Sequence, residues 1–202
     1  MSRHLYLASQ SPRRLELLRQ VGLSPLVLPL RSSPDRLDVD ETPLPEEPGI
    51  DYVRRLALKK VEAGALAQQV RHLPLWPILA ADTTVTLDGR ILGKPADAAE
   101  AAAMLHLFSG RTHTVLTAVA AAHLGRARLA LSESLVTFKP LSEAEIAAYV
   151  ASGEPYDKAG GYGIQGRAAI FIEHLAGSYS GVMGLPLHET SELLREVGFE
   201  VL

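Results

Sequence analysis

A polar turn follows the first apolar segment of the chain and contains Ser9, Ser11, Arg13 and Arg14. Ser11 and Pro12 have the residue types that begin a helix. A helix N-terminus presents free N–H groups and the positive end of the helix dipole, so it binds anions such as phosphate. Arginines are unfavourable there without an anion. The turn therefore predicts a phosphate site, with a solvated first helical turn as the alternative.

Carboxylates occur where they could hold a metal ion or accept a proton. Asp82 comes directly after the apolar residues 78–81, where a carboxylate faces the crevice at the end of a sheet. A turn or helix-capping aspartate is the alternative. A second carboxylate for Mg²⁺ or Mn²⁺, which prefer oxygen ligands, could come from Asp38, Asp40 or Glu41.

Two lysines could complete such a site. Lys60 stands on the edge of the apolar stripe of a helix predicted for residues 50–70, so it either reaches water or points into a cleft. Lys94 lies between Gly93 and Pro95, in a short rigid segment. A lysine in a surface turn is the alternative for Lys94.

Several familiar motifs fail on their context. The glycines of residues 161–166 match G-x-G-x-x-G, but a polar stretch precedes them and a strand pattern follows, which excludes a dinucleotide fingerprint. Residues 89–95 are one residue short of a P-loop and place Pro95 where Ser or Thr should be. Tyr179 stands where a hydrolase needs its nucleophilic serine. The seven histidines include no pair at helical ligand spacing.

The elements that must position these side chains alternate between strands and helices. Capping boxes are expected at Asp97 with Glu100 and at Ser142 with Glu145. A hairpin turn is expected at Asp88-Gly89. We expect a long loop over residues 31–49 and an antiparallel pair of strands over 112–123 and 127–138. Further strands are predicted at 4–8, 26–30, 78–85 and 168–173, and further helices at 12–21, 50–70, 97–108, 142–152 and 186–197.

Composition limits the class of protein. The chain has 202 residues, of which 47% are hydrophobic, which is enough for one domain or two joined lobes. Lys and Arg number 20 and Asp and Glu number 23, and the resulting net charge of −3 does not suit a duplex-DNA binder. The absence of cysteine excludes disulfides and a thiolate zinc site, and it fits a reducing compartment. We expect a cytoplasmic α/β protein with no membrane segment and no signal peptide.

Taken in order, these segments resemble the Maf family of nucleotide pyrophosphatases. They include Ala81-Asp-Thr-Thr-Val85 and Gly93-Lys-Pro95. The full set covers residues 7–14, 40–42, 56–60, 81–85, 93–95, 107–113, 152–166 and 177–187. The resemblance implies a single Maf-like domain over residues 1–202 with an elongated α/β fold: a central mixed sheet, flanking helices and a cleft between two lobes. It also implies a divalent cation, Mg²⁺ or Mn²⁺, and a homodimer.

The resemblance further implies hydrolysis of a nucleoside triphosphate between its α and β phosphates. Residues 157–166 resemble the branch that acts on dTTP and UTP, including modified pyrimidine nucleotides. Two alternatives stay open. One is an enzyme for 7-methyl-GTP or another modified nucleotide, and the other is a non-catalytic inhibitor of cell division that acts through a partner.

The resemblance also assigns roles by position. Asp82 matches the proton acceptor, and with Glu41 it could hold the metal. One carboxylate cannot easily do both fully, so the choice between these two roles of Asp82 stays open. The positions tied to substrate choice are Arg13, Thr83 and Gln165. The polar residues of the cleft are Glu41, Lys60 and Lys94. Ser11 and Arg14 match the triphosphate-binding turn. Because an amide both donates and accepts, Gln165 suits a pyrimidine edge that has a carbonyl beside an N–H.

Overall fold

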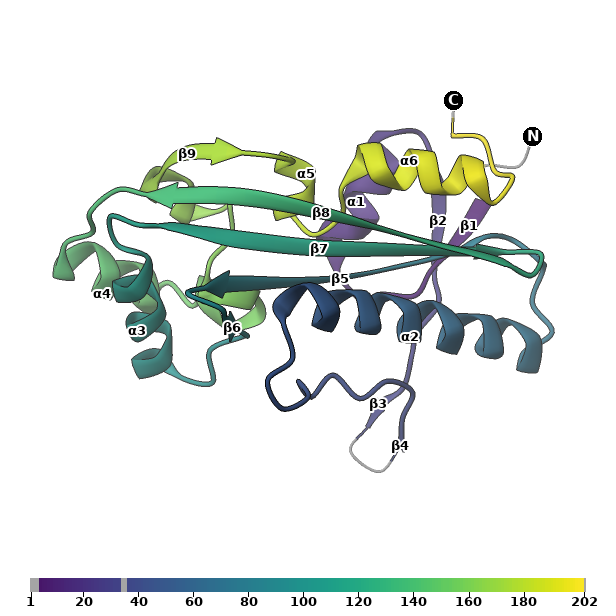
Figure 1. Cartoon of the computed structure of the whole chain (residues 1–202), viewed down its shortest axis with the longest axis horizontal. Coiled ribbons are helices and arrows are strands. Elements are labelled where there is room, and N and C mark those ends of the chain that lie inside the picture. The colour runs from purple at the N-terminus through teal and green to yellow at the C-terminus, as the bar shows by residue number, and fades with distance from the viewer. Residues whose placement is uncertain (1–3, 34–35, 202) are drawn as a thin grey trace.

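The computed structural model describes residues 4–33 and 36–201, without the side chains of residues 32–37. Its centre is a seven-stranded mixed sheet in the order β2-β1-β5-β7-β8-β9, with β6 paired to β5 (Figure 1). The strands β1–β2 and β1–β5 pair in parallel, whereas β5–β7, β7–β8 and β8–β9 are antiparallel. The predicted α/β fold with a central mixed sheet is confirmed.

The bounds of the elements follow the chain. The strands are β1 (His4–Leu7), β2 (Ser24–Val27), β3 (Ser32–Ser33), β4 (Arg36–Leu37), β5 (Ile78–Leu87), β6 (Arg90–Leu92), β7 (Thr112–His123), β8 (Arg126–Phe138) and β9 (Ile172–Ala176). The α-helices are α1 (Pro12–Gln20), α2 (Gly49–Val70), α3 (Ala98–Phe108), α4 (Glu143–Ala151), α5 (Tyr179–Val182) and α6 (Leu187–Glu196). The 3₁₀ helices are η1 (Glu154–Asp157), η2 (Ala159–Gly161) and η3 (Arg167–Phe171).

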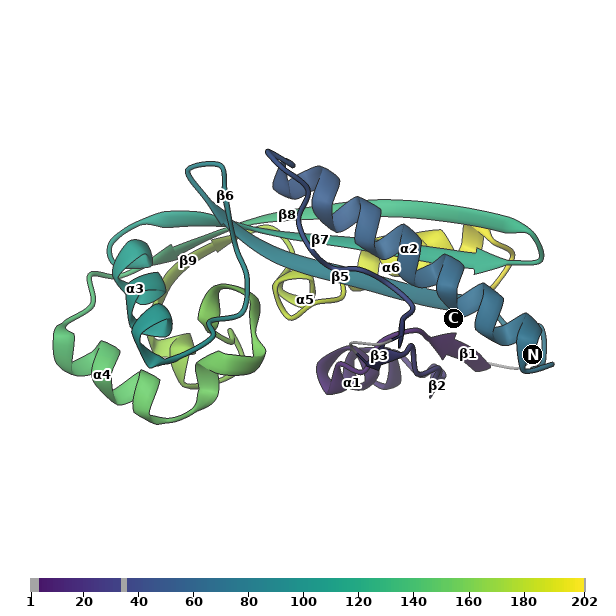
Figure 2. The ribbon, with the colours of Figure 1, turned by 90° about the horizontal axis from the view of Figure 1, so that it is seen from below.

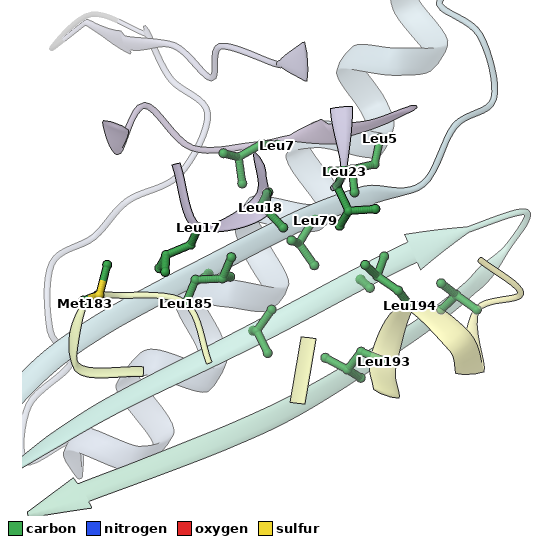
Figure 3. Close-up of a cluster of buried hydrophobic side chains, with 14 of the residues drawn as sticks. Leu5, Leu7, Leu17, Leu18, Leu23, Leu79, Met183, Leu185, Leu193 and Leu194 are labelled. Atoms are coloured by element: carbon green, nitrogen blue, oxygen red, sulfur yellow. The ribbon is translucent and has the colours of Figure 1, made fainter. Parts of the chain in front are cut away.

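Hydrophobic side chains cover both faces of the sheet. The long helix α2 packs on one face through its buried stripe, which includes Val53, Ala57 and Val61. Helices α1 and α6 pack on the opposite face around Leu18, Leu79 and the other side chains of Figure 3. The removal of this apolar surface from water drives the layers together, at about 1.5–3 kcal/mol for each large side chain.

The two ends of the long strands carry different partners. Helices α3 and α4 lie at one end, whereas α1, β1 and β2 lie together along the other half of the strands (Figure 2). A separate cluster of buried side chains, among them Phe108, Phe138 and Tyr162, fills the α3–α4 end. The division of a single domain into two lobes stays a prediction.

Most of the turns and helix caps predicted from neighbouring residues are confirmed. The hairpin turn Asp88-Gly89 has φ values of 51° and 77°, the left-handed pair that a tight turn between twisted strands requires. Ser142 and Glu145 form the complete capping box. Asp97 caps the amide of Glu100, but the carboxylate of Glu100 accepts from the amide of Ala96, so that box is only half formed.

Two predicted strands were misplaced. The second strand covers residues 24–27 instead of 26–30. Residues 168–171, the first part of the strand predicted at 168–173, belong instead to η3, in which Ala168 and Phe171 are buried three residues apart on one side of a 3₁₀ turn. The strand begins at Ile172 and pairs with β8. A short apolar run does not distinguish these two conformations.

Candidate active site

The central strand β5 has a gap along one edge. Strand β1 pairs with β5 at Ile78 and Leu79, and β6 pairs with it at residues 85–87. Between them, residues 80–84 pair with β7 on the other edge, and no strand in the described part of the chain covers the first. Asp82 and Thr83 lie in this gap. The expectation that Asp82 stands at the end of the sheet is therefore corrected: Asp82 lies inside the strand, which is predicted at 78–85 and extends to Leu87.

The gap also presents backbone groups. The carbonyl of Leu79 accepts from the amide of Ala8 at 2.8 Å, on the edge that faces β1. Since alternate residues of a strand direct their N–H and C=O groups to the same edge, those of Ala81 and Thr83 face the gap. A ligand at this place would meet backbone hydrogen-bonding groups as well as side chains.

Asp82 and Glu41 share one cation. The Nζ atom of Lys60 lies 2.6 Å from Oδ1 of Asp82 and 2.6 Å from Oε1 of Glu41. The side chains of Asp82 and Lys60 are 10% and 13% exposed, whereas that of Glu41 is 57% exposed. The structure therefore brings Asp82, Lys60 and Glu41 together, with a lysine that points from α2 into the site rather than to bulk water.

The pKa of Asp82 is raised, chiefly because burial disfavours the charged carboxylate. Lys60 and Arg14 oppose this shift, and the negative charge of Glu41 adds to it. A carboxylate with a raised pKa takes up a proton more readily, which is the property that a proton acceptor needs.

The loop that carries Glu41 is fixed by α2. The hydroxyl of Tyr52 donates to the carbonyl of Glu41 at 3.0 Å. Burial and the charges of Asp82 and Glu41 raise the pKa of Tyr52 to about 12. Arg55 donates to both carboxylate oxygens of Glu47 at 2.6 Å and to the carbonyl of Thr42 at 3.1 Å. The sequence analysis assigned no role to Tyr52 or Arg55.

Of the three candidate second carboxylates, only Glu41 joins Asp82 through Lys60 in the described chain. Asp38 instead accepts from the backbone and the side chain of Arg31, at 2.7 and 2.8 Å. Asp40 accepts from the amide of Thr42. Asp38 and Asp40 therefore stabilise turns of the loop.

Thr83 belongs to the opposite face of the sheet, since side chains alternate along a strand. Its hydroxyl lies 3.2 Å from a guanidinium nitrogen of Arg14 and 2.9 Å from the hydroxyl of Thr117, which donates to the carbonyl of Gly181. Arg14 also donates to Ser9 and to the carbonyl of Gly184, at 3.1 and 2.7 Å.

These contacts use all three guanidinium nitrogens of Arg14 to join α1, β5 and the segment after α5. Burial lowers the pKa of Arg14, and Asp82 opposes that shift across the gap. The charges of Arg14 and Asp82, whose side chains belong to opposite faces of the sheet, therefore influence each other. Ser11 is the N-cap of α1 as predicted, but its hydroxyl makes no capping bond and its amide donates to Ser9.

Three predicted residues lie outside these two groups. Arg13 forms an ion pair with Asp157 at 3.2 Å, which joins α1 to η1. Gln165 is exposed in a turn that the amide of Gly166 closes on the carbonyl of Gly163. Lys94 is exposed after β6, and no hydrogen bond or ion pair joins its side chain to another described residue. Its neighbour Gly93 accepts from the amide of Gly160.

The carboxylates suit a metal only together with a ligand. Among the described residues, no group of three His, Cys, Asp or Glu side chains could hold an ion. Asp82 and Glu41 supply two carboxylates, and Mg²⁺ sites are commonly completed by phosphate oxygens and water. The donor set therefore fits a divalent cation that arrives with a phosphate ester.

The fold and this site define an α/β protein in which two carboxylates and a lysine meet where one edge of the central strand β5 is left unpaired. A HAM1 protein from Coxiella burnetii has a similar fold, with a TM-score of 0.51 and 19% identity over 97% of this chain and 100% of that one. The model of the Maf family, described as "Maf-like protein", matches residues 4–197. The chain belongs to the Maf family, as the sequence motifs predicted.

Close relatives carry a more specific name. A protein of Nitrosomonas europaea is 57% identical over 98% of this chain and 96% of its own length. One of Aromatoleum aromaticum is 57% identical over 96% of each chain. Both are named dTTP/UTP pyrophosphatase.

Proposed function

We propose that this protein is a nucleoside triphosphate pyrophosphatase that hydrolyses dTTP and UTP, and modified pyrimidine nucleotides, to the monophosphate and pyrophosphate. The observation that carries the proposal is the position of Lys60 at the gap in β5. Its Nζ atom lies 2.6 Å from Oδ1 of Asp82 and 2.6 Å from Oε1 of Glu41. The relatives named dTTP/UTP pyrophosphatase share more than half of their residues with this chain. Clearing unwanted nucleotides from the pool is the role that follows.

In the proposed reaction, Asp82 accepts the proton of the water that attacks the α-phosphorus. The bond from the α-phosphorus to the bridging oxygen breaks, and the electron pair leaves with pyrophosphate. The buried position of Asp82 raises its pKa and so favours proton uptake. Lys60 fixes the direction of the carboxylate through its hydrogen bond.

The phosphates would lie against the cationic side chains. The N-terminus of α1 with Ser11 offers free N–H groups, and Arg13, Arg14 and Lys94 add positive charge. A divalent cation, Mg²⁺ or Mn²⁺, would be held by Asp82 and Glu41 and, when bound, would neutralise charge on the phosphate oxygens. Thr83, Arg13 and Gln165 would select the nucleotide, with Gln165 donating to and accepting from the pyrimidine edge.

The proposal is tested by incubating the purified chain with dTTP, UTP and 7-methyl-GTP, each with Mg²⁺ or Mn²⁺, and separating the products by ion exchange. We expect monophosphate and pyrophosphate from the two pyrimidine nucleotides. Turnover of 7-methyl-GTP alone would move the chain to the other specificity. No turnover of any nucleotide would favour the non-catalytic cell-division inhibitor.

We also propose that the protein acts on free nucleotides in the cytoplasm, as a homodimer, and binds neither nucleic acid nor membrane. The net charge of −3 and the absence of cysteine support this setting. No helix in the part of the chain that the structure describes is long and apolar enough to cross a membrane. Light scattering of the purified chain would give its mass, for which a monomer would contradict the dimer.

A further inference from the structure

The turn that carries Gln165 is attached to a pair of side chains, the buried Tyr149 and the partly buried Glu154. The Tyr149 hydroxyl donates to Oε1 of Glu154 at 3.0 Å and accepts from the amide of Gly163 at 3.4 Å. The other carboxylate oxygen of Glu154 accepts from the amide of Arg167 at 3.0 Å. The pair therefore bonds to the backbone on both sides of Gln165.

The backbone approaches Glu154 so closely that any side chain at residue 166 would displace the carboxylate. A Cβ atom at Gly166 would lie 2.0 Å from Oε1 of Glu154 and 2.5 Å from its Cδ, well inside van der Waals contact. Glu154 is itself held at its backbone, because the Nζ atom of Lys158 donates to its carbonyl at 2.7 Å. The carboxylate thus fixes the path of the turn from one side.

The hydrophobic core fixes the turn from the other side. Ile164, next to Gln165, is buried in the cluster that contains Leu17 and Leu18 of α1. Tyr149 belongs instead to the cluster of the α3–α4 end. The backbone around Gln165 is therefore hydrogen-bonded to Tyr149 and Glu154, near the α3–α4 end of the molecule. The neighbouring side chain of Ile164 packs into the other cluster, which contains α1.

We propose that Glu154 is a positioning residue that sets nucleotide selectivity by holding the turn of Gln165. This inference rests on the proposed function, in which Gln165 reads the base. Without the carboxylate, the amide of Arg167 loses its acceptor and Tyr149, which accepts from the amide of Gly163, loses the group that holds its hydroxyl. The Gln165 amide is then no longer directed at one hydrogen-bonding edge. A displacement of about 1 Å is enough to lose about a hundredfold in activity at such a site.

The test compares UTP with CTP, whose base presents an amino group and an unprotonated ring nitrogen at the edge in question. In Glu154→Ala we expect the ratio of kcat/KM for UTP over CTP to fall about tenfold or more, towards the ratio of Gln165→Ala. The double variant should match Gln165→Ala, since both changes remove the same discrimination. Glu154→Gln should keep most of the ratio, because its amide oxygen still accepts from Arg167 and its amino group can donate to Tyr149.

A matched control and a second readout separate the possible failures. Glu143→Ala removes a carboxylate that is 86% exposed on α4 and should leave the ratio unchanged. Hydrogen exchange of residues 163–167, which needs no activity, should be faster in Glu154→Ala and near wild type in Glu154→Gln. Unchanged exchange, or faster exchange with an unchanged UTP-over-CTP ratio, would overturn the inference. A wild-type chain that hydrolyses neither UTP nor dTTP would refute the proposed function, while the exchange still reports on Glu154.

Discussion

Replacing Lys60 by methionine removes the cation that Asp82 and Glu41 share. The two carboxylate oxygens each lie 2.6 Å from Nζ, so they are at most 5.2 Å apart. At an effective dielectric constant of about 20, two unit charges at that distance repel by about 3 kcal/mol. Because Glu41 is more than half exposed, solvent reduces this figure, and we expect Lys60→Met to lose about 2 kcal/mol of unfolding free energy at pH 8.

The loss should depend on pH in a defined direction. Without Lys60, burial and Glu41 raise the pKa of Asp82 with less opposition. As the pH falls, a carboxyl group whose pKa is raised in the folded chain becomes protonated at a higher pH than in the unfolded chain. Lowering the pH towards about 4 therefore neutralises Asp82 and relieves its repulsion by Glu41. The difference between wild type and Lys60→Met should therefore shrink on acidification.

Urea unfolding at pH 8, 7, 6 and 5 measures this difference. Lys59→Met is the matched control, because Lys59 is exposed on the same helix and should change stability by no more than about 0.5 kcal/mol. A Lys60→Met chain as stable as wild type at pH 8, or one whose deficit does not change with pH, would refute the shared-cation interpretation of the site.

Two further changes test the segments around the site. Gly166→Ala places a Cβ 2.0 Å from Glu154, so we expect a loss of about 1–3 kcal/mol in urea unfolding and a lower preference for UTP over CTP; wild-type values would contradict the close approach. Arg55 lowers the pKa of Glu47 to about 2, below the unfolded value of 4.5, so this pair stabilises the fold above pH 4.5 and loses its effect as the pH falls towards 2. Glu47→Gln should therefore be less stable than wild type at pH 6 and approach it near pH 2, whereas Glu46→Gln should follow wild type throughout.

Much of the fold could be predicted because its signals are local. The Ser142–Glu145 capping box and the Asp88-Gly89 turn depend on residues within a few positions of each other. The strand at residues 168–173 was wrong because an apolar run of that length suits a buried 3₁₀ turn as well. Only the pairing of Ile172 and later residues with β8 decides where the strand begins.

The site was predictable in residue type but not in arrangement. A lysine at the edge of the apolar stripe of α2 and a carboxylate in an apolar strand were visible, and their contact at 2.6 Å follows from the packing of α2 on β5. The gap in β5 depends on where two other strands stop, which no local pattern records. The period of two along a strand could have shown that Thr83 faces away from Asp82.

The residues that hold the site gave no sequence signal of their own. Arg55 lies eight positions after Glu47, and their ion pair forms because the loop folds back onto α2. Glu154 binds the amide of Arg167 thirteen residues later, across a turn that the tertiary packing of Ile164 also holds. Contacts between a side chain and a distant backbone group leave no periodic pattern in the sequence.

In the proposed reaction, Asp82 takes part in the cleavage of the α–β phosphate bond. The most direct measurement compares wild type with Asp82→Asn by ion-exchange separation of the products of UTP, with UTP binding followed in parallel by calorimetry. We predict UMP and pyrophosphate from wild type, and none from Asp82→Asn, which should still bind UTP. UDP and phosphate from wild type, or undiminished turnover by Asp82→Asn, would contradict this account.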